Sequence, residues 1–132
     1  METGRFKFRV WEKDQKIMKE ATQLTLDKAQ TGSMCDVKGK VTAHLVYQPH
    51  YIVMQSTGLK DKNGQLIYEG DVVYRKGLKR YNGEKLYSKV VWDEMYAAFV
   101  LSDEGGFHRM PSNLSKTEIV GNIYQNNEFK GL

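Results

Sequence analysis

The chain has 132 residues, with 20 Lys and Arg against 16 Asp and Glu, so its net charge is +4 with His neutral. A chain of this length forms one domain and can bury one modest core without help from disulfides. The single cysteine, Cys35, excludes an intramolecular disulfide framework and a multi-cysteine zinc site, and predicts a reducing, cytoplasmic location.

Residues 1–56 carry strand signals at both ends. Phe6–Trp11 alternates apolar and basic residues, which is typical of a half-buried strand. A polar break follows, and Ile17 resumes apolar character, so we expect a hairpin return, with a short helix as the alternative. The stretch from residue 19 to residue 40 stays open, because Lys19–Leu26 fits a helix whereas glycine-containing breakers follow it.

Strand character returns at residue 41. Val41–Tyr47 and Tyr51–Gln55 are rich in β-branched and aromatic residues, and Pro49 predicts a corner between them. Residues 57–70 form a turn-rich connector, in which Asn63 and Gly64 supply the positive φ angles of a tight reversal.

The C-terminal half has the rhythm of a small barrel. Five strand candidates are separated by turn residues: Asp71–Arg75, Tyr87–Asp93, Ala97–Ser102, Gly106–Met110 and Glu118–Tyr124. Pro111–Leu114 suits the 3₁₀ turn that precedes the last strand of an SH3-like barrel. We therefore predict a mainly β protein, with an SH3-like five-stranded barrel over residues 71–126, a smaller β-rich part over residues 1–56 and a tail over residues 127–132.

Several residues receive structural roles from this pattern. Val91, Phe99 and Ile123 are expected to face inward, and Trp11 and Trp92 are assigned to the core. Asp71 stands at a strand entry, where its side chain can accept backbone N–H groups. Gly121 lies inside a strand pattern, which indicates a bulge or a close backbone approach.

Four segments together resemble the YopX-like family of phage and prophage proteins. They are KFRVW at residues 7–11, MQSTGLKDKNG at residues 54–64, IYEGDVV at residues 67–73 and VGNIYQN at residues 120–126. Their order and spacing make the resemblance specific, and they frame nearly the whole chain. The resemblance implies a β-rich fold, a phage or prophage origin and a bacterial cytoplasmic setting. It implies no activity, because no catalytic motif transfers to positions in this chain.

The sequence offers little support for an enzyme, a metal site or a cofactor. Possible ligands are Cys35, His44, His50 and His108, whose spacing matches no known ligand pattern. The pairs Asp93-Glu94 and Asp103-Glu104 fall in predicted turns, where solvated acids are the simpler interpretation. No phosphate-binding loop motif is present. We therefore predict no catalytic residues, no bound metal and no cofactor.

Membrane insertion and export are not expected either. No apolar run approaches the ~20 residues that a membrane helix requires. The first five residues, METGR, do not resemble a signal peptide.

One charged segment stands out as a functional candidate. Residues 75–89 hold six basic residues against Glu84, with tyrosines between them. Such a composition is typical of a nucleic-acid contact loop, although a long solvated loop also attracts Lys and Arg. The candidate contact residues are Arg75, Lys76, Lys79, Arg80, Tyr81, Lys85 and Lys89.

These observations predict a non-enzymatic binding protein. The leading hypothesis is a phage or prophage accessory module that binds a host or phage macromolecule and associates with itself, because uncovered edge strands invite pairing with another copy. One alternative is a nucleic-acid-binding protein that uses the basic loop at residues 75–89. A second alternative is a structural assembly protein.

Overall fold

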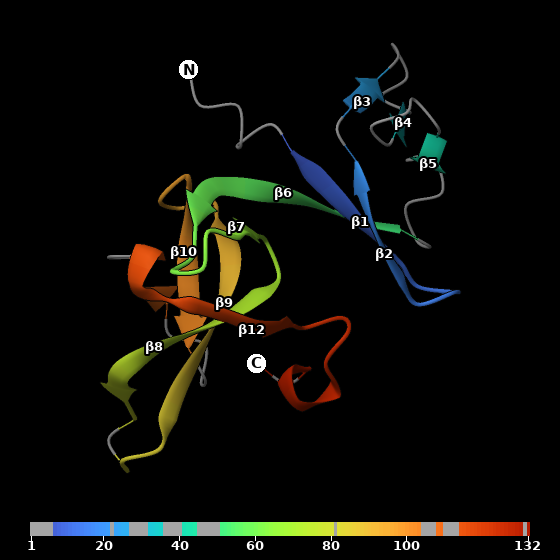
Figure 1. Ribbon diagram of the computed structural model, residues 1–132. Coiled ribbons are helices and arrows are strands. Elements are labelled where there is room, and N and C mark those ends of the chain that lie inside the picture. Colours follow the sequence, from blue (N-terminus) through green and yellow to red (C-terminus); the bar gives the residue numbers. More distant parts are fainter. Residues whose placement is uncertain are drawn as a thin grey trace. The chain divides into compact units, whose positions relative to one another are not determined.

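A computed structural model describes residues 7–21, 23–26, 32–35, 41–44, 51–80, 82–103, 108–109, 114–130 and 132 (Figure 1). Antiparallel strands dominate these residues and form three sheets. This organisation confirms the prediction of a mainly β protein. The chain forms two compact units that divide between Gly58 and Leu59.

The first unit is built around the N-terminal hairpin. Strand β1 (Phe8–Glu12) lies between β2 (Ile17–Ala21) and the first half of β6 (Tyr51–Lys60), with Val10 opposite both Lys19 and Val53. Val10, Trp11 and Met54 are buried. The predicted first strand, its hairpin return and the assignment of Trp11 to the core are therefore confirmed, and the alternative helix after residue 17 is wrong.

A second, three-stranded sheet occupies the segment that the sequence left open. It has the order β3 (Gln23–Leu26), β4 (Gly32–Cys35), β5 (Val41–His44). The helical alternative for Lys19–Leu26 is thus wrong, because pairing with β4 overrides the local helix propensity. The strand predicted from residue 41 is confirmed as far as His44, whereas the corner at Pro49 lies outside the described residues.

The second unit contains the five-stranded sheet expected in the C-terminal half. Its order is β11 (His108–Arg109), β10 (Ala98–Asp103), β9 (Lys85–Asp93), β8 (Asp71–Lys79), β12 (Glu118–Asn122), and β7 (Leu66–Tyr68) precedes it in the chain. Among the described residues, 3₁₀ helices lie at Leu114–Lys116, which begins at the last residue of the predicted turn, and at Asn127–Phe129. The rest of that predicted turn, residues 111–113, lies outside the described residues. The SH3-like form of the barrel stays a prediction.

Five buried side chains form the core of the second unit, and two half-buried ones pack against it. The buried residues are Ile67, Val73, Val90, Leu101 and Leu114, and the half-buried ones are Phe99 and Ile119. The prediction had chosen the wrong face of β9, because Val90 faces this core and Val91 is only half-buried. Ile123, also expected inside, is half-buried. Trp92, assigned to the core, is 48% exposed, because it lies at the end of the strand beyond the core residues.

Asp61 connects two distant segments of the second unit. Its Oδ1 accepts the backbone N–H groups of Asn63 and Gln65, each at 2.9 Å, and its Oδ2 accepts the N–H of Ile119 at 3.0 Å. The Lys62 N–H also donates to the Thr117 carbonyl at 2.8 Å. The turn after β6 is therefore fastened to the beginning of β12.

Two structural predictions at other positions are confirmed. The carboxylate of Asp71 accepts the Tyr68 N–H at 2.8 Å at the entry to β8. The register between β8 and β12 shifts next to Gly121, as expected of a bulge. A Cβ at Gly121 would lie 2.5 Å from the Asn126 Oδ1 atom, so the close approach of this side chain also favours glycine here.

The pKa of Asp61 yields a prediction about stability. Burial acts to raise this pKa, but the N–H donors of Ile119, Gln65 and Asn63 together lower it below its ordinary value of 3.8. A lowered pKa stabilises the fold above pH 3.8, and this stabilisation is lost as the pH falls through the lower folded value. Asp61→Asn should therefore lower the unfolding free energy at pH 7 by about 1.5–3 kcal/mol.

Urea unfolding of both proteins between pH 7 and pH 2.5 would check this prediction. The difference in unfolding free energy between the two proteins should narrow below about pH 4. Protonation of Asp61 removes its contribution from the native protein, whereas the amide of the variant does not titrate. A difference that stays constant over the whole range would contradict the assigned role of the charge.

A matched pair of valine substitutions tests the face of β9 that packs inward. Val90 is 2% exposed within the core, whereas Val91 is half-buried. Val90→Ala should cost about 2 kcal/mol or more, from lost burial and the cavity that remains. Val91→Ala should cost less than about 1 kcal/mol. Equal losses of unfolding free energy in the two variants, measured by denaturant unfolding, would show that the two faces of β9 are buried alike.

Candidate nucleic-acid interface

The basic segment at residues 75–89 is a β-hairpin, and the prediction of a long loop was wrong. Strand β8 continues to Lys79, β9 begins at Lys85, and their register places these two lysines opposite each other. A tight turn joins the strands, closed by the Arg80 N–H donating to the Glu84 carbonyl at 2.8 Å. Figure 1 shows the hairpin extending beyond the other strands of the second unit. We call residues 71–93 the basic hairpin.

The structure brings the six basic candidate residues onto this one element but exposes them unequally. Lys76, Lys79 and Lys85 are exposed, while Arg75, Arg80 and Lys89 are half-buried. Tyr81 lies outside the described residues.

Three of the six cations already have partners within the chain. Arg80 Nη1 is 3.2 Å from Glu84 Oε2, and Lys85 Nζ lies 5.2 Å from the centre of the Tyr74 ring. Lys89 Nζ donates to the Leu132 carbonyl at 2.7 Å. These contacts leave the exposed lysines of β8 as the charges most available to a ligand.

An aromatic group lies on the same hairpin, and the sequence had indicated only one of its members, Tyr87. Tyr74 and Tyr87 are register partners, with ring centres 5.8 Å apart, and Tyr87 also lies 5.5 Å from Phe129. Because side chains alternate along a strand, Tyr87 shares its face with Lys85 and Lys89. In the sequence, lysines and a tyrosine stand at every second position from Lys85 to Lys89. This spacing could have indicated that they share one face of a strand.

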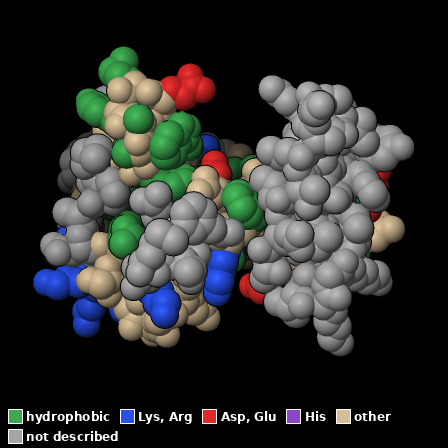
Figure 2. Space-filling model, turned by 90° about the horizontal axis from the view of Figure 1, so that it is seen from above, with side chains coloured by type: hydrophobic (Ala, Val, Ile, Leu, Met, Phe, Trp, Pro, Cys, Tyr) green, Lys and Arg blue, Asp and Glu red, His purple; other side chains and the backbone are tan. Residues whose placement is uncertain are grey.

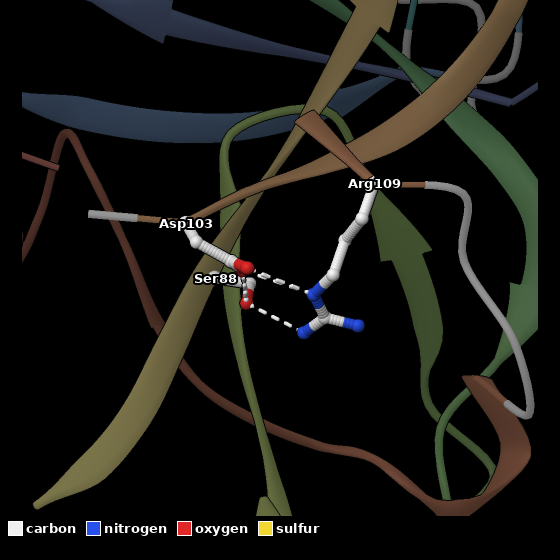
Figure 3. Close-up of polar contacts among 3 residues, drawn as sticks. All are labelled: Ser88, Asp103 and Arg109. Carbon is white, nitrogen blue, oxygen red and sulfur yellow. Dashed lines mark hydrogen bonds and ion pairs between the residues drawn. The ribbon is translucent and has the colours of Figure 1, made fainter. Parts of the chain in front are cut away.

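A polar cluster fastens the opposite face of the hairpin to the neighbouring strands (Figure 3). The Ser88 hydroxyl donates to Asp103 Oδ1, and Arg109 donates from Nε to Asp103 Oδ2 at 2.9 Å and from Nη2 to Ser88 Oγ at 3.0 Å. The interpretation of Asp103 as a solvated turn acid was therefore wrong, because it belongs to β10. Ser88 is 1% exposed, so this cluster suits a structural clamp between β9, β10 and β11 better than a nucleophile.

Asp93 also has more partners than the sequence indicated. Its Oδ1 accepts the N–H groups of Met95 and Tyr96 at 2.8 and 3.1 Å, and its Oδ2 lies 2.8 Å from His108 Nδ1. The His108 hydrogen bond, with help from the backbone donors, lowers the pKa of Asp93. This carboxylate therefore orders the turn between β9 and β10.

The described part of the chain contains no group of three His, Cys, Asp or Glu side chains that could hold a metal ion. The side chains of Cys35, His44 and His50 lie outside that part. The helices that the structure does describe are short 3₁₀ turns, and none has the length and apolarity to cross a membrane.

Comparison with known proteins gives a fold and a family. The crystal structure of protein EF1440 from Enterococcus faecalis is similar at 23% sequence identity and a TM-score of 0.58, and the match covers 92% of this chain and 95% of that one. This likeness concerns the fold alone. No curated protein sequence matches the chain. The family described as YopX protein matches residues 7–129, which confirms the resemblance seen in the sequence, and the chain therefore belongs to the YopX family.

Proposed function

We propose that this protein is a non-enzymatic module that binds nucleic acid through the basic hairpin, as an accessory protein of a phage or prophage. One observation carries the proposal. Residues 75–89 of the hairpin hold six cations against Glu84, and Lys79 of one strand faces Lys85 of the other at its far end. Membership of the YopX family and the phage setting implied by the sequence resemblance supply the context.

The shape of the hairpin fits this ligand. A two-stranded antiparallel ribbon is one of the two elements that the major groove of B-DNA admits, and its backbone N–H groups can also face phosphates. Single strands are an equally suitable ligand for lysines interleaved with aromatic rings, since stacking does not depend on base sequence. In either case the contacts are electrostatic, so we expect little sequence preference.

Self-association is the competing proposal for the same protein. Edge strands β11 and β12 bound the five-stranded sheet of the second unit, and edges of this kind can pair with another copy. If the sheet closes into an SH3-like barrel, less of its edge is exposed for pairing with another copy. We propose both the barrel and a structural assembly role as alternatives to be tested. Salt-dependent binding to DNA would support the nucleic-acid function. A molecular mass that rises with protein concentration would support self-association.

The salt dependence of binding tests the nucleic-acid proposal directly. Contacts from the three exposed lysines should give a slope of about −2 to −3 in log K against log salt concentration, for both single-stranded and duplex DNA. The measurement is a fluorescence-anisotropy titration of a labelled oligonucleotide between ~50 and ~200 mM salt. Absence of saturable binding at ~50 mM would rule the proposal out, and light scattering would then show whether the protein instead self-assembles.

A charge-matched pair of variants shows where the nucleic acid lies. Lys76→Gln with Lys79→Gln should reduce the magnitude of the slope by about two, because each phosphate-contacting lysine contributes about one. Lys13→Gln with Lys116→Gln removes the same charge from exposed positions outside the hairpin and should leave the slope unchanged. Equal effects from the two pairs would indicate attraction by net charge alone.

A further inference from the structure

Apolar side chains gather on the surface at the end of the second unit's sheet, away from the basic end of the hairpin. In the turn between β9 and β10, Met95 is 87% exposed and Tyr96 is 61% exposed, beside Trp92 at 48%. Glu94, in the same turn, is also exposed. We call Trp92, Glu94, Met95 and Tyr96 the apolar tip. Figure 2 shows hydrophobic side chains gathered beside an acidic one, separate from the Lys and Arg side chains on that face.

The apolar tip is anchored to the core. Trp92 is the register partner of Phe99, and their rings meet edge to face with centres 5.1 Å apart. Phe99 in turn packs against the core that contains Val90 and Leu101. The Trp92 ring is therefore fixed before any ligand arrives, which reduces the entropy lost on binding.

The turn that carries the tip is also held in place. Asp93 accepts two backbone N–H groups of the turn and contacts His108 on β11. Ala97 has a φ of +49°, a conformation that a non-glycine residue adopts only where its surroundings require it. An ordered turn that displays large apolar side chains to solvent is typical of a protein-binding surface.

We propose that the apolar tip is a docking surface for a segment of another protein that carries both basic and apolar side chains. Charge selects this partner. The acidic residues Asp93 and Glu94 follow Trp92 directly in the chain, and Glu94 is exposed, although the chain as a whole has a net charge of +4. A guanidinium can stack on Trp92 or Tyr96 while it pairs with Glu94, and Met95 adapts to a neighbouring apolar side chain. The same carboxylates repel phosphates, so this surface is independent of the proposed nucleic-acid contacts.

Trp92 supplies the readout for a binding test. The chain has two tryptophans, and Trp11 is buried at 8% exposure. The probes are two synthetic octapeptides, one alternating Arg with Leu and the other alternating Glu with Leu. The Arg-Leu peptide should change the tryptophan emission saturably, with a Kd below about 1 mM, and the Glu-Leu peptide should not. Trp92→Phe should abolish the change.

Paired variants place the contact on the tip. Tyr96→Ser should weaken binding by more than about fivefold, as truncation of an aromatic anchor does. Leu59→Ser removes an apolar side chain that is 51% exposed on β6, outside the tip residues, and it should have no effect. Glu94→Gln should weaken binding by about two- to fivefold, in the range of one exposed ion pair, whereas Glu128→Gln should not. Unchanged melting temperatures would show that all four variants keep the fold.

Three outcomes of the peptide titrations would overturn the proposal. They are no saturable emission change up to about 5 mM Arg-Leu peptide, equal binding of the acidic peptide, or equal losses in Tyr96→Ser and Leu59→Ser. A change in Trp92 emission when the free protein is concentrated would overturn it as well, because a second copy would then cover the tip.

Discussion

The second unit depends on the buried carboxylate of Asp61. Its side chain satisfies backbone donors in the turn after β6 and at the beginning of β12, two segments separated by more than fifty positions in the chain. A buried carboxylate without these donors would be costly, and three N–H groups without an acceptor would be costly as well. Because each side needs the other, the turn and the edge strand stabilise each other. Asp71 and Asn122 repeat this arrangement on a smaller scale at the entry to β8 and at the end of β12.

Local sequence patterns predicted the features that depend on neighbouring residues. The turn at Gly64, where φ is +79°, and the bulge at Gly121 follow from the conformational freedom of glycine, which one position can reveal. The positive φ also predicted for Asn63 is wrong, because glycine alone takes that conformation in this turn. The strands of the second unit were also predicted from local patterns. Each is a run rich in β-branched and aromatic residues, and turn residues bound these runs along the chain.

Features that depend on distant partners could not be predicted in this way. The sequence does not show that Asp93 meets His108 or that Asp103 meets Arg109, because these contacts arise only when β9, β10 and β11 pair. The burial of Val90 in place of Val91 depends on which face of the sheet receives Ile67 and Leu114. Hydrophobicity likewise placed Trp92 in the core, whereas its position at the end of β9 leaves it at the surface. Periodicity identifies a strand but leaves the choice of face to packing.

Strand β9 joins the two proposed surfaces and keeps them apart. It runs from Lys85 at the basic end to Asp93 at the apolar tip, and Ser88 in between is clamped by Asp103 and Arg109. At about 3.3 Å per residue, the two ends are separated by roughly 26 Å. This distance is about three Debye lengths at physiological salt, so phosphates at one end and a basic segment at the other would barely interact electrostatically. The buried clamp and the core residues of β9 also resist independent movement of the two ends. A single rigid strand can thus present opposite charges to two ligands at once, which is the arrangement that an accessory protein linking a nucleic acid to another protein would need.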